Sequence, residues 1–418
     1  MERKNGAERQ RESCGDGGRG MYGEVVCILQ GGGVMRSLVS GGSLAVVAML
    51  PLLVACGAEA DAPGVAERED DDRGAAAGAQ PSPSGADPAP PTSATPAPGA
   101  GAIACIAQPK CDGGGGPQLA AKHPFEHTLS TIAAASGPAF HRGRDQIYAT
   151  GDAQWVIGKM TYTYLDKDLK DEAVDVFVER GCSGTWEKLG ATRTTATDGA
   201  HATVEGVEDN GGRVFFEIPR AKELPVGRHR IRLVVTADQT STDLLIDVVP
   251  KATSIVVSDV DGTLTSSESA EYPALLTGSL PDAQPDAANV LSALAAKGHR
   301  VVYLTARPEW LTARTREFLT SAGFPPGILH TTTGVTGAIG AAAASYKSGE
   351  LAMLQAHGHT IAWAFGNKAS DTDAYAAAKI QPADHRVFLQ VTDTHGGRRI
   401  ESYAQLLPIV TTLPAICQ

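Results

Sequence analysis

Excess positive charge, aromatic side chains and long apolar runs are all scarce in this sequence. The formal net charge of the 418 residues is −11. The chain therefore lacks the basic footprint that nucleic-acid binding needs, and we expect no nucleic-acid partner. Aromatic residues make up only 5%, which together with abundant Ala and Gly indicates biased codon use rather than a function. The longest apolar run falls short of the ~20 residues that span a membrane.

That longest apolar run, "SLAVVAMLPLLVA", follows Met35 and Arg36 and ends at Cys56. A positive residue, a short apolar core and small residues before a cleavage point are typical of a secretory signal peptide. The ending "LVAC" resembles a bacterial lipobox, which implies that Cys56 is acylated and anchors the chain in the bacterial cell envelope. The alternatives are a plain signal peptide or a buried apolar strand. We assign residues 1–55 to a leader and lipoprotein signal peptide.

Large apolar side chains are almost absent between Gly57 and about Gly101, where Pro, Ala, Gly and Asp dominate. Such a segment cannot bury enough apolar surface to offset its conformational entropy. We therefore predict a disordered tether over residues 56–103, which would connect an anchored Cys56 to a folded body.

Four cysteines follow the tether: Cys105, Cys111, Cys182 and Cys417. An even number in a chain predicted to be exported suggests two disulfides, for which three pairings are possible. A zinc site is the alternative, but the spacing matches no common zinc pattern.

Residues 104–250 have the pattern of an all-β domain. Short runs rich in β-branched and aromatic residues are separated by Gly, Asp and Pro turns. These runs cover residues 153–165, 173–181, 212–219, 227–235 and 241–250. Polar and apolar residues alternate from His229 to Val235, as they do in a half-buried antiparallel strand. Several such strands in succession predict a small β-sandwich-like domain.

Residues 251–418 have a different pattern, in which apolar strands alternate with amphipathic helices. Strands are predicted at 253–260, 299–307, 360–367 and 385–391, and helices at 285–298, 308–323, 346–358 and 371–380. Strands that are apolar throughout belong to a parallel sheet covered on both faces. We therefore predict an α/β fold with a Rossmann-like parallel sheet. In such sheets ligands bind at the carboxyl ends of the strands.

Polar side chains gather where these strands should end. They are Asp259 and Asp261 after the first strand, Thr305, Ala306 and Arg307 at the second, Asn367 and Asp371 after a later one, and Lys347 on the helix before it. Oxygen ligands of this kind suit Mg²⁺, which pairs readily with phosphate. A hydroxyl, an ammonium and backbone N–H groups suit phosphate oxygens. The sequence therefore predicts a site for Mg²⁺ and a phosphate group.

This constellation resembles the haloacid dehalogenase-like phosphatases, on the strength of "DVDGT", Thr305, Lys347 and "GNKASD". The stretch 253–410 looks closest to the catalytic domain of lipins, the Mg²⁺-dependent phosphatidate phosphatases. The motifs that carry this resemblance are "DVDGTLTSSE", "YLTARP", "YKSGELAML", "AFGNKASDTDAY" and "RVFLQV". The short segment between Thr265 and Pro285 implies a minimal cap, and hence an open site suited to a large substrate.

The resemblance implies a role for each residue. Asp259 would be the nucleophile, and Asp261 would protonate the leaving oxygen and then activate water. The phosphate would be bound by Gly262, Thr263, Thr305, Ala306 and Lys347. The Mg²⁺ ligands would be Asp259, Asp261, Asn367 and Asp371. Taken singly, each of these residues can also have a purely structural role. Thr305 or Asp371 could cap a helix, Lys347 could be a solvated lysine, and Arg307 could form a surface ion pair.

The function that the resemblance implies is Mg²⁺-dependent hydrolysis of a phosphomonoester through an aspartyl-phosphate. The substrate would be phosphatidate or a related phospholipid, and the membrane partner would be reached through the lipid anchor at Cys56. Two alternatives stay open. One is a broad periplasmic phosphomonoesterase acting on small substrates, and the other is a non-catalytic, lipid-binding surface module.

Overall fold

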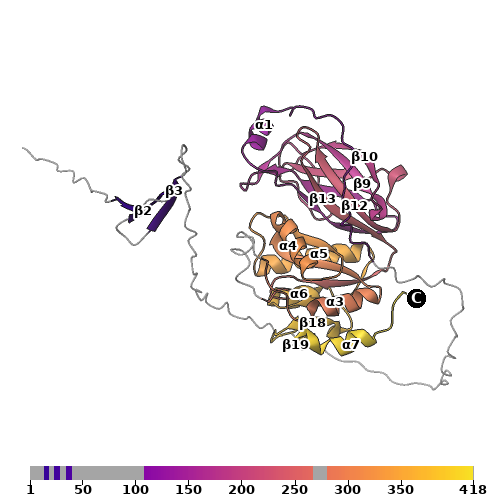
Figure 1. The fold of residues 1–418 in the computed structure, drawn as a ribbon. Coiled ribbons are helices and arrows are strands. Elements are labelled where there is room, and N and C mark those ends of the chain that lie inside the picture. Colours follow the sequence, from indigo (N-terminus) through magenta and orange to yellow (C-terminus); the bar gives the residue numbers. More distant parts are fainter. Residues whose placement is uncertain (1–13, 18–22, 29–33, 40–107, 267–279, 418) are drawn as a thin grey trace, which may run out of the picture. The chain divides into compact units, whose positions relative to one another are not determined.

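The computed structural model describes residues 14–17, 23–28, 34–39, 108–266 and 280–417 (Figure 1). The chain divides into two units, residues 1–94 and residues 95–418. In the first unit, three antiparallel strands pair in the order β1-β2-β3. Their bounds are β1 Cys14–Gly17, β2 Gly23–Ile28 and β3 Val34–Val39. Cys56 and the predicted tether lie outside the described residues, so the tether stays a prediction.

The β part of the second unit contains two main sheets. Five strands pair in the order β10-β9-β12-β13-β5, and three pair in the order β11-β6-β4. The strands are β4 Arg142–Arg144, β5 Gln146–Ala149, β6 Trp155–Lys159, β9 Ala173–Glu179, β10 Trp186–Arg193, β11 Arg213–Glu217, β12 Gly227–Val235 and β13 Ser241–Val249. Only the β13–β5 pair is parallel among them. One apolar core joins residues of both sheets, such as Val156, Val214 and Leu233, as in a sandwich. The predicted β domain is confirmed.

Helix α1 spans Thr128–Ala135, and the short pair β7 Thr161–Tyr162 and β8 Lys167–Asp168 forms its own ladder. Strands β4, β5 and β10 lie outside the predicted runs, and helix α1 and strand β8 were not predicted either, whereas β7 falls within the predicted run 153–165. The turn between β7 and β8 carries Tyr164 and Leu165, which are among the most exposed large apolar side chains that the structure describes.

The α/β part contains one parallel sheet with the strand order β16-β15-β14-β17-β18-β19. The strands are β14 Ser254–Ser258, β15 Arg300–Pro308, β16 Gly327–Thr332, β17 Thr360–Gly366, β18 Arg386–Leu389 and β19 Arg398–Ile400. The helices are α3 Ala287–Ala296, α4 Thr312–Ser321, α5 Ala341–Ala356, α6 Ala369–Ala377 and α7 Leu407–Thr412. The predicted parallel sheet is confirmed.

Alternation along β14 explains why its sequence is apolar throughout. Val256 joins the core formed with α3, α4 and α7, whereas Ile255 and Val257 join the core formed with α5 and α6. Both faces of the sheet are therefore covered by helices, and no strand position can be polar without a partner. The finer assignment to a haloacid dehalogenase-like fold with a minimal cap stays a prediction, because residues 267–279 lie outside the described part.

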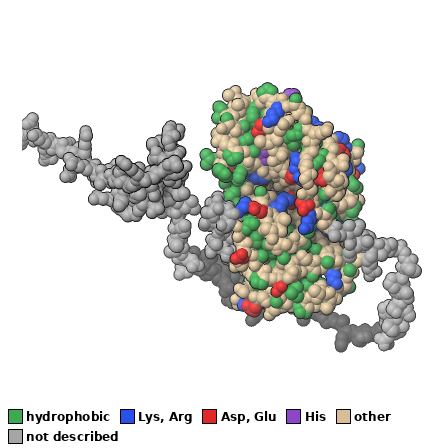
Figure 2. All heavy atoms as spheres, viewed as in Figure 1, with side chains coloured by type: hydrophobic (Ala, Val, Ile, Leu, Met, Phe, Trp, Pro, Cys, Tyr) green, Lys and Arg blue, Asp and Glu red, His purple; other side chains and the backbone are tan. Residues whose placement is uncertain are grey.

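Charged side chains connect the β part to the α/β part. Arg144 of β4 donates to Glu350 of α5 at 2.5 Å, and Glu350 also lies 2.6 Å from the His330 ring. Arg213 of β11 binds Glu309, which follows β15, at 2.9 Å. Figure 2 shows basic and acidic side chains mixed along this boundary. The two parts are thus held by ion pairs as well as by apolar contacts such as that of Ile147 with the α5 core.

One disulfide joins Cys111 to Cys182. It selects one of the three pairings that the sequence allowed. Cys417 is disulfide-bonded as well, and Cys105 lies outside the described residues.

Candidate functional site

The predicted polar residues meet at the carboxyl edge of the parallel sheet. Asp259 and Asn367 directly follow β14 and β17, and Thr305 lies in the C-terminal half of β15; these three strands are neighbours in the sheet. A backbone contact ties the first of them to the next strand, since Asp259 N donates to Phe365 O at 2.9 Å. Gly366 is required here, because a Cβ at that position would lie 2.4 Å from the Cβ of Asp371.

Asp259, Lys347 and Asp371 form a buried group, which we call the Lys347 cluster. Lys347 Nζ lies 2.7 Å from Asp259 Oδ1 and 2.5 Å from Asp371 Oδ1. All three residues are at most 3% exposed. Asp371 Oδ2 also accepts hydrogen bonds from the backbone of Asn367 and Lys368, and so caps the start of α6. Lys347 is therefore a bridge between two carboxylates and not a solvated lysine.

Asp261, Thr305 and Arg307 form a second group, which we call the Arg307 cluster. Arg307 Nη2 donates to Asp261 Oδ1 at 2.7 Å, and Arg307 Nε lies 3.0 Å from Asp261 Oδ2. The Thr305 hydroxyl donates to Asp261 Oδ2 at 2.9 Å. Arg307 is almost fully buried, so its ion pair is not a surface contact. Thr305 lies within β15, which runs to Pro308, and does not cap a helix.

The turn after β14 connects the two clusters. Gly262 has a φ of 73°, a left-handed conformation that favours glycine, and its N–H donates to the Thr265 hydroxyl at 2.8 Å. The Thr263 hydroxyl lies 3.0 Å from Asp259 Oδ2 and 2.8 Å from Asn367 Oδ1. Ala306 contributes a backbone oxygen that accepts from Ala338 N at 2.9 Å. Every residue predicted to bind the phosphate or the metal therefore lies at this edge.

Burial decides the electrostatics of the Lys347 cluster. It raises the pKa of Asp259 to about 7, although the Lys347 ammonium opposes this rise. Burial by itself lowers the pKa of Lys347, but Asp259 and Asp371 outweigh it, so the pKa of Lys347 is raised overall. Lys347 is therefore a permanent cation, whereas Asp259 is close to its titration point at neutral pH.

The oxygen atoms at this edge are of the kind that Mg²⁺ prefers, but they do not form a cage. In the part of the chain that the structure describes, no three His, Cys, Asp or Glu side chains converge as a metal cluster. Asp259 Oδ2 and Asn367 Oδ1 are the pair that lies close together, on either side of the Thr263 hydroxyl. Two protein oxygens are enough for a Mg²⁺ ion whose coordination shell is completed by phosphate oxygens and water. The magnesium ligand set stays a prediction.

Sequence reasoning missed two residues that shape this edge. Tyr403 is buried, and its hydroxyl donates to Thr263 O at 3.0 Å. Glu309 follows the site strand and binds both Arg213 and Arg142 of the β part. No spacing pattern in the sequence marks either residue. In the sequence, Tyr403 is an isolated tyrosine and Glu309 is a single charged residue next to Pro308.

Two family models match the chain, one for each folded part of the second unit. The LNS2 domain of PITM 1-3 matches residues 256–389. The beta-sandwich domain of PITM 1-3 matches residues 139–248. Neither model covers half of the chain.

The curated relatives are animal proteins. Membrane-associated phosphatidylinositol transfer protein 3 of Mus musculus is 30% identical over 199 residues, which are 47% of this chain and 18% of that protein. Protein retinal degeneration B of Drosophila melanogaster is 29% identical over 232 residues, which are 55% and 16%. Membrane-associated phosphatidylinositol transfer protein 2 of Homo sapiens is 28% identical over 246 residues, which are 58% and 16%. The chain spans less than a fifth of the length of these relatives.

These matches correct the enzyme prediction. The relatives carry the names of phosphatidylinositol transfer proteins, so the phosphatase, hydrolase and lipin-like descriptions are wrong. The geometry gives a physical reason. The guanidinium of Arg307 and the hydroxyl of Thr305 hydrogen-bond both oxygens of Asp261, so the predicted acid is already engaged within the fold. Asp259, the predicted nucleophile, is held by Lys347 at one oxygen and by Thr263 at the other.

The prediction of a bacterial lipoprotein is wrong as well. It rested on the apolar run that ends at Cys56, whereas the matches lie in the two folded parts and are to membrane-associated animal proteins. A short apolar run followed by a cysteine is too brief a pattern to outweigh them. The lipin resemblance and the envelope localisation are corrected with it. Among the residues described, the structure contains no helix with the length and apolar character needed to cross a membrane.

Proposed function

We propose that the α/β part is a phospholipid-binding module that takes the phosphate of an anionic lipid at the carboxyl edge of its sheet. No reaction follows binding. The names of the relatives support this proposal, because they describe membrane-associated proteins that transfer a phospholipid. The chemistry of the edge supports it as well, since Thr305, Lys347 and the backbone after Asp259 are groups that suit phosphate oxygens.

The observation that carries the proposal is an apolar rim beside the site. Val335 and Ile339 are 65% and 88% exposed, on the loop that follows β16. The same loop touches the site, because Ala338 N donates to Ala306 O and the Trp310 ring donates to Val335 O. Exposed apolar side chains beside a polar site are what a protein needs to rest on a bilayer while it binds a headgroup.

We further propose that Mg²⁺ joins the lipid phosphate to this edge. The Lys347 and Arg307 clusters contain three carboxylates but only two cations, so their formal charge is negative and repels an anion. Asp259 and Asn367 would hold the ion, with Asp371 and Asp261 behind them. The bound ion would supply the positive charge that attracts the phosphate.

Vesicle flotation tests this function. The full chain should bind vesicles of phosphatidate in phosphatidylcholine, and chelation of Mg²⁺ by EDTA should weaken this binding about tenfold. Asn367→Ala should weaken it to a similar extent, because the ion loses a ligand. The matched control is Asn289→Ala on α3, where the amide contacts Asp286 at the surface. Equal binding to vesicles of phosphatidylcholine alone would overturn the proposal.

A further inference from the structure

A large cavity lies at the opposite, amino edge of the parallel sheet. Its volume is about 1480 Å³. That exceeds the ~300–1,000 Å³ of pockets that take drug-sized molecules. It is bounded by the β part on one side and by the helices α3 and α4 on the other. Nothing in the phosphate site borders it, since that site lies at the far ends of the same strands.

The walls of the cavity are largely apolar. They include Leu244 of β13, Ala296 of α3, Leu319 of α4, Phe324 and Ile416. Leu319 and Phe324 also belong to the buried core, so packing within the core holds these two wall side chains in place. Such walls suit an aliphatic chain, and each methylene buried there contributes ~0.8 kcal/mol.

Among the described residues, three cations that line this cavity form no ion pair with a carboxylate: the exposed Lys110 and Lys251 and the partly buried Arg300. Arg228 also borders the cavity, but it is neutralised by Asp247, with two contacts of 2.7 Å. Arg300, the first residue of β15, is partly buried, and no carboxylate among the described residues forms an ion pair with it. Burial lowers the pKa of Arg300, and nearby Arg228 adds to this effect, although the carboxylate of Asp247 opposes it. The cavity therefore combines apolar walls with one guanidinium that a negative group would stabilise.

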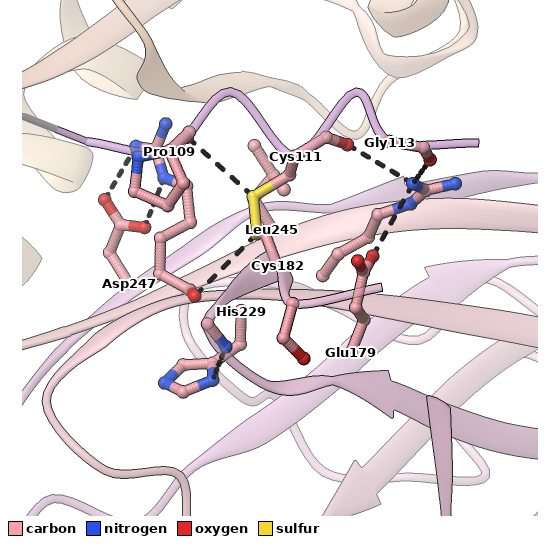
Figure 3. The surroundings of a disulfide bond; sticks show 12 residues. Pro109, Cys111, Gly113, Glu179, Cys182, His229, Leu245 and Asp247 are labelled. Atoms are coloured by element: carbon pink, nitrogen blue, oxygen red, sulfur yellow. Dashed lines mark hydrogen bonds and ion pairs between the residues drawn. A yellow bond between two sulfur atoms is a disulfide. The ribbon is translucent and has the colours of Figure 1, made fainter. Parts of the chain in front are cut away.

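A covalently fixed strap forms one side of the cavity. The strap, residues 108–115, contributes lining residues and is joined to the β part by the Cys111–Cys182 disulfide. Arg230 donates to Gly113 O at 2.9 Å and to Cys111 O at 3.3 Å. Figure 3 shows the strap crossing the strands beside Leu245 and Asp247, with the disulfide beneath it. The wall is therefore part of the folded structure.

We infer that this cavity binds an anionic amphiphile, with its acyl chain between α3, α4 and the strap and its negative head at the Arg300 guanidinium. The volume, the apolar walls and the unpaired Arg300 together favour this ligand. A free anion would leave the apolar walls empty, and a neutral lipid would leave Arg300 without a partner. This site is separate from the proposed phosphate site and needs no Mg²⁺.

Calorimetric titration of the delipidated full chain tests the inference, with palmitate, palmityl alcohol and inorganic phosphate as probes. Palmitate should bind in the presence of EDTA, and the alcohol and phosphate should bind at least about tenfold more weakly. Arg300→Gln should weaken palmitate binding about tenfold, whereas Arg300→Lys should lose less because it keeps the charge. Ala296→Trp, at an exposed position of the wall, should block the chain without disturbing the core.

The matched control is Arg399→Gln on β19, which lies outside the cavity lining and pairs with Glu401 at the surface. It should bind palmitate as the parent does. The inference would be overturned if palmitate failed to bind, or if Ala296→Trp and Arg300→Gln both bound it with the affinity of the parent. Thermal unfolding of each variant establishes that the fold is retained.

Discussion

At the scale of single residues, Lys347 compensates the buried negative charge of the candidate site. Its ammonium lies between the carboxylates of Asp259 and Asp371, and all three side chains are buried. Two buried carboxylates without a cation would repel each other in a medium that screens poorly. The site is therefore a balanced group of charges in which each member depends on the others.

Replacing Lys347 should destabilise the fold strongly. We expect Lys347→Met to lower the free energy of unfolding by about 3–5 kcal/mol, because it leaves an uncompensated buried charge. Urea denaturation measures this loss. Adding Asp371→Asn should restore part of it, since the remaining carboxylate then faces a neutral neighbour. Lys251→Met, at an exposed lysine, is the control and should change stability by no more than about 0.5 kcal/mol. A similarly small loss for Lys347→Met would contradict this account.

Residue types and strand ends allowed much of the site to be predicted. Parallel strands bring their carboxyl ends together, so Asp259, Thr305 and Asn367 could be placed at one edge from their positions alone. What could not be predicted is the pairing within that edge. Whether Arg307 points to solvent or to Asp261 depends on side-chain packing against Thr315, which sequence spacing does not encode. The pairing matters, because it leaves both oxygens of Asp261 hydrogen-bonded within the fold.

At the scale of elements, the boundary between the β part and α5 depends on a histidine. His357 follows α5 and lies between Asp152, at 2.7 Å, and Glu205, at 2.9 Å. Hydrogen bonds to Glu205 and Asp152 raise its pKa. These three residues lie in turns whose sequences contain no periodic pattern. That is why sequence analysis predicted both folded parts but not how they are joined.

The His357 contact should make stability depend on pH. A histidine with a raised pKa stabilises the fold fully below its unfolded pKa of ~6.5, and this contribution is lost as the pH rises through the higher folded value. His357→Gln should therefore cost about 1 kcal/mol in acid and progressively less in alkaline solution. Urea unfolding across pH measures this difference, with His123→Gln at an exposed position as control. A cost that stays constant with pH would argue against the ion pairs.

At the scale of the whole second unit, a chain of ion pairs and hydrogen bonds links the exposed Leu165 of the β part to the exposed Val335 and Ile339 of the α/β part. Arg142 binds Asp166 in the turn that carries Leu165, and it also binds Glu309. Trp310, next to Glu309, donates to the loop of Val335 and Ile339. Figure 2 shows hydrophobic side chains along the side of the β part where α1 lies. The β7–β8 turn and the rim are thus linked through the buried Arg142 and Glu309, and we expect both to contact a bilayer as one face.

Charges placed on this face should detach the protein from membranes. Burying one large aliphatic side chain is worth ~1.5–3 kcal/mol. Ile339→Glu and Leu165→Glu, at positions 88% and 90% exposed, should therefore each weaken vesicle binding by about tenfold or more. Flotation measures this effect. Ala356→Glu is the control, because Ala356 is exposed at the end of α5, which leads to the start of β17 at the opposite edge of the sheet, and does not line the cavity. If all three variants bound vesicles equally well, the face would not contact the bilayer.

Strand β15 begins at Arg300 in the cavity and reaches Thr305 and Arg307 at the phosphate site. At about 3.3 Å per residue, the seven steps from Arg300 to Arg307 place the two backbone positions roughly 23 Å apart. Because β15 is hydrogen-bonded on both sides within the sheet, the distance between the two proposed sites is fixed. A headgroup at one end cannot displace a headgroup at the other, so the proposed ligands would bind with a stoichiometry of two and without competition.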